Sequence, residues 1–153
     1  MANMKFILLP VLLSAVLIFN ACGGSNTTTT IKKSKAPVKI GIYDFSLIDS
    51  VGIKLADGTL NFKSADKNKI TGNFDVTNQY ADNIPGLFNK SGDFEGQFSL
   101  ELNKVSVNMN PKVADANIFL NGDCYQDSII GTWNYSTMRG PLNTGVFKAF
   151  YRK

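Results

Sequence analysis

Few side chains in this sequence have the type and spacing that catalysis requires. The chain contains no histidine, so the commonest general base and any nucleophile paired with histidine are absent. Glu95 and Glu101 share a face of a predicted strand, but they would lie about 20 Å apart, too far for a pair of glycosidase carboxylates. Cys124 has no histidine to activate it and is expected to be a buried, inert thiol. We therefore expect no catalytic residue and no enzymatic activity.

Metal ligands are equally sparse. Asp115, Asp123 and Asp127 form a loose acidic group, but they lack the alternate spacing and central glycine of a calcium loop. We expect no metal site and no cofactor.

The formal charge of +4 is concentrated before the first predicted strand, at Lys32, Lys33, Lys35 and Lys39. From residue 40 onward, eleven Lys and Arg residues face twelve carboxylates, so the net charge of this part is −1. A neutral domain lacks the electrostatic signature of a nucleic-acid-binding protein. We expect no nucleic-acid partner.

The other cysteine, Cys22, ends an apolar run that begins at Phe6. Lys5 precedes the run and the small residue Ala21 closes it, which is the layout of a signal peptide. A transmembrane anchor is one alternative, but a bilayer core of about 30 Å needs roughly 20 apolar residues, and this run is shorter and contains Pro10. A secreted chain with an unmodified cysteine is another.

The segment Phe19, Asn20, Ala21, Cys22 resembles the lipobox of bacterial lipoproteins. The resemblance implies a signal peptide over residues 1–21, cleavage after Ala21 and acylation of Cys22 with fatty acids such as palmitate. It also implies a protein anchored by lipid in the cell envelope, on the periplasmic or surface side of an outer membrane if the organism has one. Cys124 would then be the one remaining thiol, so no disulfide could form within the chain.

Residues 22–38 are predicted to be the acylated cysteine and a flexible tether. They are rich in Gly, Ser, Thr and Lys and contain few apolar residues that could offset the entropy of ordering. A coil of about 15 residues spans ~20 Å on average. Residues 39–153 are long enough for a single domain with one core.

A glycine followed two residues later by a large apolar residue recurs through this domain. The pairs are Gly41 and Tyr43, Gly72 and Phe74, Gly96 and Phe98, Gly131 and Trp133, and Gly145 and Phe147. A spacing of two places both residues on the same face of a β-strand. Polar residues occupy the intervening positions, which indicates strands with one buried and one solvated face.

The pattern predicts an all-β fold, an antiparallel up-and-down meander of about eight strands that forms a small closed barrel. A β-sandwich is the alternative. Asp57 and Gly58 are predicted to form a tight hairpin turn. The strand that contains Phe94 is expected to continue its apolar face through Leu100 and Leu102.

The motif Gly131, Thr132, Trp133 resembles the Gly-X-Trp element of lipocalin-like and avidin-like (calycin) β-barrels. The resemblance concerns the architecture of residues 40–153 and implies a barrel that binds a ligand. In those families the element lies in the first strand, whereas here it lies in the penultimate predicted strand. No ligand-binding residue is therefore transferred to this chain.

The predicted interior alternates large side chains with glycines. The glycines either make room for a ligand or let neighbouring aromatic rings cover bare backbone. Two predicted loops with apolar residues, 80–93 and 138–142, would form the mouth of a pocket if they lie at one end of the barrel. The candidate ligand contacts are Tyr80, Phe88, Trp133 and Tyr135.

Two functional hypotheses remain. In the first, the barrel carries a small apolar or amphipathic ligand. In the second, the barrel is filled and the protein is a structural or interaction lipoprotein that contacts another envelope protein. That contact would use an edge strand or the polar face, where Phe119, Ile130 and Phe150 would form an apolar patch. A membrane-spanning barrel is a third alternative, for which several predicted strands are short.

Overall fold

Alternating apolar and polar residues form eight antiparallel strands in the computed structural model, which describes residues 35–81, 84, 87 and 90–153. The strands are β1 (Gly41–Asp49), β2 (Lys54–Asp66), β3 (Lys69–Gln79), β4 (Ser91–Ser99), β5 (Lys104–Asn108), β6 (Asn117–Tyr125), β7 (Ser128–Thr137) and β8 (Gly140–Tyr151). The described residues contain no helix. The predicted signal peptide, Cys22, residues 22–34 of the predicted tether, and Phe88 lie outside the described residues.

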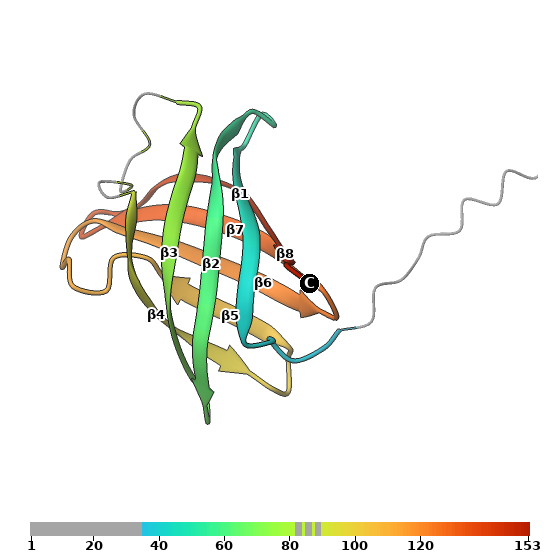
Figure 1. The fold of residues 1–153 in the computed structure, drawn as a ribbon. Helices are drawn as coiled ribbons and strands as arrows, with labels where there is room; N and C mark the ends of the chain where they lie inside the picture. The colour runs from blue at the N-terminus through green and yellow to red at the C-terminus, as the bar shows by residue number, and fades with distance from the viewer. Residues whose placement is uncertain (1–34, 82–83, 85–86, 88–89) are drawn as a thin grey trace, which may run out of the picture. The chain divides into compact units, whose positions relative to one another are not determined.

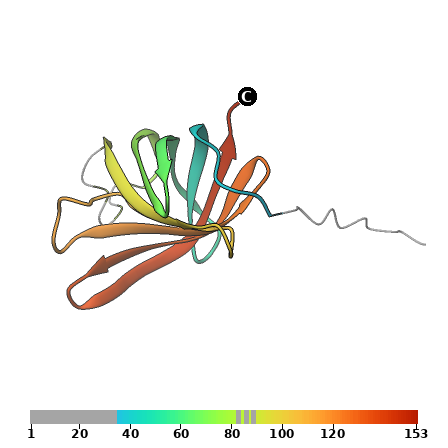
Figure 2. The ribbon, with the colours of Figure 1, turned by 90° about the horizontal axis from the view of Figure 1, so that it is seen from below.

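Each strand pairs with the next, and β1 also pairs with β8, so the sheet closes into a barrel. The strands β1 to β3 run upright across the view of Figure 1, and β6 to β8 cross behind them at a steep angle; Figure 2 shows the same barrel from below. The predicted all-β closed meander is confirmed, and the β-sandwich alternative is wrong. Because every described strand is paired on both sides, the predicted contact through an edge strand is not available in this fold.

The meander divides the connections between two ends of the barrel. The end we call the loop end holds the connections β1–β2, β3–β4, β5–β6 and β7–β8. The other, which we call the terminal end, holds the remaining three connections, the start of β1 and the end of β8. The predicted loops 80–93 and 138–142 therefore lie at the same end, as a pocket mouth would require.

The interior is occupied by a continuous cluster of buried side chains. Its aromatic members are Tyr43, Phe45, Phe62, Phe74, Phe94, Phe98, Trp133 and Phe147. Tyr43 and Phe62 meet edge to face with ring centroids 5.2 Å apart, and Phe62 meets Phe94 in the same way at 5.1 Å. At the loop end, Ile84 is buried and Leu87 packs against the cluster, so these two side chains help to cover it.

Gly72 and Gly145 of the repeated pattern, together with Gly122 on β6, make room for neighbouring side chains of the core. A Cβ atom at Gly72 would lie 2.4 Å from the Phe94 ring. One at Gly145 would lie 2.5 Å from Trp133 Nε1, and one at Gly122 would lie 2.8 Å from Ile129. Aromatic and branched side chains thus lie on bare backbone. The structure favours the prediction that the glycines serve core packing over the alternative that they line a cavity.

The predicted hairpin at Asp57 and Gly58 is wrong. Both residues lie inside β2, where the register to β3 shifts between them. A Cβ at Gly58 would come within 2.0 Å of the Asp75 carbonyl oxygen, so this glycine permits a close approach of two strands rather than a turn. The actual β1–β2 turn uses residues 50–53, where Asp49 Oδ1 accepts hydrogen bonds from the amides of Val51 (3.0 Å) and Ile53 (2.8 Å).

The expected apolar face at Leu100 and Leu102 is also wrong. β4 ends at Ser99, and both leucines lie in the β4–β5 turn with exposed side chains. The amide of Leu102 donates to Ser99 Oγ at 3.3 Å, and Asn103 has a positive φ of 50°. The turn therefore ends the alternation before these two residues.

The segment before β1, residues 35–39, crosses to the β6–β7 side of the terminal end, and we call it the strap. Lys35 forms a bridge with Tyr125, and its ammonium group lies 2.9 Å from Asp123. Lys39 Nζ lies 2.7 Å from Asp127 Oδ1. The Ala36 amide donates to the Cys124 carbonyl at 3.1 Å. These contacts join the segment that precedes the barrel to the end of β6 and the β6–β7 turn, 88 residues further along the sequence.

Candidate functional site

Trp133 is part of the packed core. Only 2% of its surface is exposed, and its indole N–H donates to the Ile48 carbonyl oxygen at 2.8 Å. Tyr135, two residues further along β7, is half-buried and packs against the same cluster. Both predicted contacts thus lie on the inner side of β7 near the loop end, where their neighbours are protein side chains.

Tyr80 lies elsewhere. The residue is 57% exposed, its hydroxyl donates to Asp57 Oδ2 at 2.8 Å, and Lys54 Nζ lies 5.4 Å from the centroid of its ring. Asp57 also accepts hydrogen bonds from Lys54 and Asn78. These hydrogen bonds, of which the one from Lys54 has the largest effect, hold the pKa of the Asp57 carboxyl below its usual range. Tyr80 therefore belongs to an outer polar cluster on β2, and the structure does not bring it to Trp133.

Cys124 is fully buried at the terminal end of the core. Burial raises the pKa of its thiol to about 12. A thiol is a weak nucleophile until it loses its proton, so this side chain behaves as a small apolar residue. Within the described part of the chain, no group of three or more carboxylate, cysteine or histidine side chains is arranged to hold a metal ion.

The outer surface of the barrel is hollowed over β4 to β7, and we call this hollow the outer groove. Its volume is about 730 Å³. Its lining side chains include Asn68, Gln97, Ser99, Leu100, Glu101, Lys104, Ser106, Asn121, Asp123, Ile130 and Thr132. A second hollow, which contains Phe119 and Glu95, shares Asn68, Gln97 and Ser106 with it, so the two form one continuous depression.

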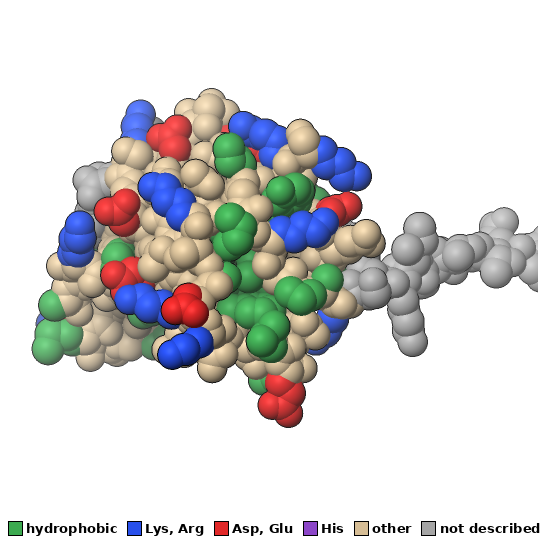
Figure 3. Space-filling model, turned by 60° about the horizontal axis from the view of Figure 1, so that its bottom comes forward, with side chains coloured by type: hydrophobic (Ala, Val, Ile, Leu, Met, Phe, Trp, Pro, Cys, Tyr) green, Lys and Arg blue, Asp and Glu red, His purple; other side chains and the backbone are tan. Residues whose placement is uncertain are grey.

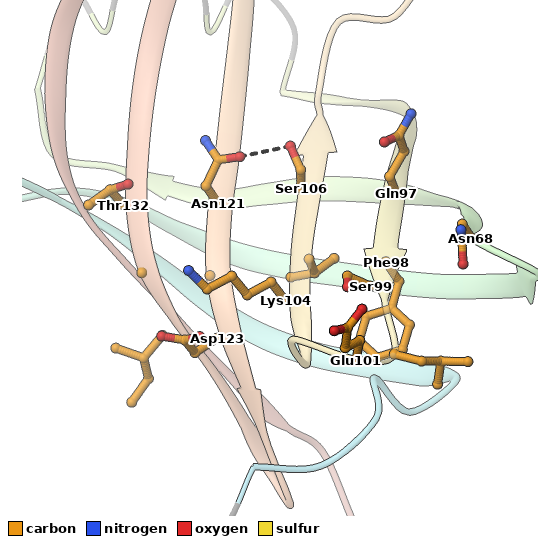
Figure 4. Close-up of a pocket in the computed structure, with 15 residues that line it drawn as sticks. Asn68, Gln97, Phe98, Ser99, Glu101, Lys104, Ser106, Asn121, Asp123 and Thr132 are labelled. Carbon is orange, nitrogen blue, oxygen red and sulfur yellow. Dashed lines mark hydrogen bonds between the residues drawn. The ribbon is translucent and has the colours of Figure 1, made fainter.

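Strand register explains the floor of this groove. Gln97 pairs with Ser106, Ser106 with Asn121, and Asn121 with Thr132, so four outward polar side chains form one row across four strands. Figure 4 shows these side chains next to one another, with the hydrogen bond from Ser106 Oγ to Asn121 Oδ1 at 2.7 Å. We call these four residues the polar row.

A second row runs beside the first. Asn108 pairs with Phe119, and Phe119 with Asn134, on the same outer side of β5, β6 and β7. On the opposite side of the polar row, Asp123 pairs with Ile130. Two of the three predicted apolar patch residues, Phe119 and Ile130, therefore flank the polar row rather than touching each other.

Phe150, the third residue of the predicted apolar patch, is half exposed on β8 and pairs with Asp44 and Ser128. It does not line the groove. In Figure 3, lysine, arginine and carboxylate side chains are interspersed over the visible face, with hydrophobic side chains gathered between them. Charges of both signs therefore lie on this face of the domain.

The polar row was not predicted from the sequence. Its members occupy the solvated positions of alternating strands, where polar residues are expected in any barrel. A partial signal was present, because Gln97, Asn108, Asn121 and Asn134 place one carboxamide on each of four successive strands. The register was needed to show that Gln97 and Asn121 belong to the polar row, whereas Asn108 and Asn134 lie in the row beside it.

No model of a known protein family matches this chain, and a comparison with curated proteins finds no significant match. The part of the chain that the structure describes contains no helix of the length and hydrophobicity needed to cross a membrane. The site must therefore be interpreted from its own chemistry.

Proposed function

We propose that this protein is a non-catalytic lipoprotein of the cell envelope whose filled barrel acts through its outer surface. The observation that carries the proposal is the packed interior. Eight buried aromatic side chains and their aliphatic neighbours occupy the space in which a lipocalin-like barrel would hold a ligand. A carrier function would require these side chains to move apart.

Polar bonding within the core supports the same interpretation. The indole N–H of Trp133 is already paired with Ile48, and the Tyr43 hydroxyl accepts from the Lys39 amide at 3.0 Å. Polar groups that are buried and satisfied within the protein offer no specific contact to an enclosed ligand. The outer surface, in contrast, carries a hollow with polar side chains.

The lipid anchor rests on the sequence of residues 1–22, with Cys22 as the acylated residue. The strap supports a defined attachment, because it places residue 35 at the terminal end of the barrel. Only residues 23–34 would then separate the acylated cysteine from the barrel. A flexible coil of this length spans ~19 Å on average, which keeps the domain next to the membrane and its envelope partners.

Metabolic labelling tests the anchor. The full chain and a Cys22→Ser variant are expressed with a radioactive or clickable palmitate analogue, and membrane and soluble fractions are compared. We expect label and membrane association in the wild type and neither label nor processing in the variant. An unlabelled wild type, or a variant that is labelled and processed like the wild type, would contradict lipid anchoring.

Native mass spectrometry and the fluorescence of Trp133, the single tryptophan, test the filled barrel. We expect no copurified small molecule and no change in tryptophan emission on addition of a fatty acid. A bound apolar molecule that quenches Trp133 would instead establish the carrier function of the first hypothesis.

A further inference from the structure

We propose that the outer groove binds a neutral carbohydrate chain. The inference deepens the proposed function and rests on it for the choice of the outer surface as the working surface. It is argued from the hydrogen-bonding groups of the polar row, the ring beside that row and the charge of the groove.

The polar row offers both donors and acceptors without net charge. A carboxamide can donate and accept at the same time, as can a hydroxyl group, and a sugar with neighbouring hydroxyl groups presents the complementary pattern. The bond from Ser106 Oγ to Asn121 Oδ1 fixes the carboxamide of Asn121 and leaves its two N–H donors for another acceptor. Among the described residues, the side chains of Gln97 and Thr132 have no hydrogen-bond partner.

The length of the row suggests a chain rather than a single sugar. Gln97 and Thr132 lie three strand spacings apart, which corresponds to ~14 Å. The hollow continues past Gln97 and Ser106 into the second hollow. A ligand in contact with the whole row would therefore contain at least two sugar rings.

Phe119 provides the apolar contact that a sugar ring needs on its C–H face. It is half-buried on the outer side of β6, between Asn108 and Asn134. A ring held between carboxamides gives the combination of one apolar surface and several convergent polar groups that is typical of small-ligand sites. The Asn108 carboxamide oxygen already accepts from the Asn110 amide at 2.9 Å, so its N–H donors remain for a ligand.

The charge of the groove favours a neutral ligand over an acidic one. Three cations face four carboxylates around the two hollows: Lys67, Lys69, Lys104 and Asp66, Glu95, Glu101, Asp123. Glu95 is paired with Lys69 at 3.3 Å, and Asp123 with Lys35 of the strap at 2.9 Å. The groove therefore has no net positive charge that would attract a polyanion.

Calorimetry on the full chain tests the proposal. The protein is purified in a detergent without a sugar headgroup and titrated with hexamers of glucose, mannose, galactose and N-acetylglucosamine. We expect saturable binding of at least one oligosaccharide. We expect about tenfold weaker binding in Asn121→Ala and in Phe119→Ala. Each substitution removes a contact whose contribution to the binding free energy is similar to that of one hydrogen bond.

Asn143→Ala is the matched control, because Asn143 is an exposed carboxamide on β8 that does not line the groove. Its binding should equal that of the wild type, and all three variants should keep the wild-type circular dichroism and melting temperature. No heat with any of the four hexamers overturns the proposal. So does binding that the groove variants leave unchanged, or preferential binding of a sulfated polysaccharide.

The two proposals fail separately. A chain that is labelled with palmitate but binds no hexamer overturns the carbohydrate site and leaves the lipoprotein assignment in place. A chain that binds a hexamer through Asn121 and Phe119 but carries no label overturns the lipoprotein assignment and leaves the carbohydrate site in place.

Discussion

The indole N–H of Trp133 on β7 donates to the carbonyl oxygen of Ile48 on β1, at 2.8 Å, across the intervening strand β8. The crossing is possible because Trp133 pairs with Gly145 and Gly145 pairs with Asp49. With hydrogen in place of a side chain at residue 145, the ring can lie against the backbone of β8. One side chain thus connects three strands where the barrel closes.

Truncation of Trp133 should be strongly destabilising. Trp133→Ala removes a large buried side chain and should lower the free energy of unfolding by ~3–5 kcal/mol. Trp133→Phe keeps most of the volume but leaves the Ile48 carbonyl without its donor, and should cost ~1–3 kcal/mol. Denaturant unfolding followed by circular dichroism measures both. A loss under ~0.5 kcal/mol in the alanine variant would place Trp133 outside the core.

An added methyl group at Gly145 should also destabilise the barrel. A Cβ there would lie 2.0 Å from the Ile48 oxygen and 2.5 Å from Trp133 Nε1, so backbone must move. We expect Gly145→Ala to cost ~1–3 kcal/mol in the same unfolding experiment.

Gly92→Ala is the control for this substitution. The nearest atom to a Cβ at residue 92 is in the Phe74 ring at 3.1 Å, a side chain that can shift slightly. Its effect should be smaller than that of Gly145→Ala. Equal costs for the two variants would contradict the close approach at Gly145.

The fold could be predicted because its main determinant is local. Alternation with period two identifies strands, and the Gly-X-aromatic pairs identify which face is buried. The position of Gly58 could not be predicted, because Asp-Gly is a turn signal in sequence, and only the close approach of Asp75 on β3 shows why glycine is needed inside β2. The prediction that Leu100 and Leu102 continue the buried face of β4 was wrong because the alternation of apolar and polar residues extends by chance into the turn after Ser99.

The outer groove could not be predicted for a different reason. Ser106 and Asn121 are ordinary residues for the solvated side of a strand, and their relation depends on the register between β5 and β6. Register follows from turn lengths and bulges across the whole barrel, which the sequence specifies only to within a few residues. The inner position of Trp133, in contrast, follows directly from its motif.

Cys124 should resist alkylation in the folded protein. Its thiol is fully buried, and burial raises its pKa from 9.0 to about 12, so the thiolate is scarce at pH 8. We expect iodoacetamide to modify Cys124 at least about a hundredfold more slowly in the native chain than in guanidinium, because the thiolate is the nucleophile.

Mass spectrometry of the peptide that contains Cys124 distinguishes this thiol from Cys22. The raised pKa also makes the stability of the fold depend on pH, because the folded protein favours the protonated thiol. The stability that Cys124 contributes is complete below pH 9.0 and is lost as the pH rises toward about 12. Rapid modification at pH 8 without unfolding would contradict the buried position.

The strap should loosen in acid. The hydrogen bond from Lys39 lowers the pKa of the Asp127 carboxyl below its ordinary value of 3.8. The stability that the ionised Asp127 carboxylate contributes is therefore present above pH 3.8, and it is lost as the pH falls through the lower pKa of the folded state. Hydrogen exchange at the Ala36 amide, which bonds to Cys124, reports this change as a falling protection factor.

Substitution of Lys39 tests the same contact at neutral pH. We expect Lys39→Ala to reduce the protection of the Ala36 amide, with little change in global stability, since ion pairs at the surface contribute little. Lys153→Ala is the control, because Lys153 lies 3.7 Å from Asp127 but is almost fully exposed. If both variants exchange at the wild-type rate, Lys39 does not hold the strap.

The pairing of β1 with β8 has a consequence for how the chain folds. It joins Tyr43 to Tyr151 and Asp49 to Gly145, contacts between the two ends of the domain. Contacts so distant in sequence slow folding, and all-β domains that are rich in them fold on the millisecond to second scale. Without β8, β1 and β7 would each present unpaired backbone and Trp133 would have no strand to cross. The twelve-residue strand β8 therefore both completes the core and covers two strand edges that could otherwise pair with another chain.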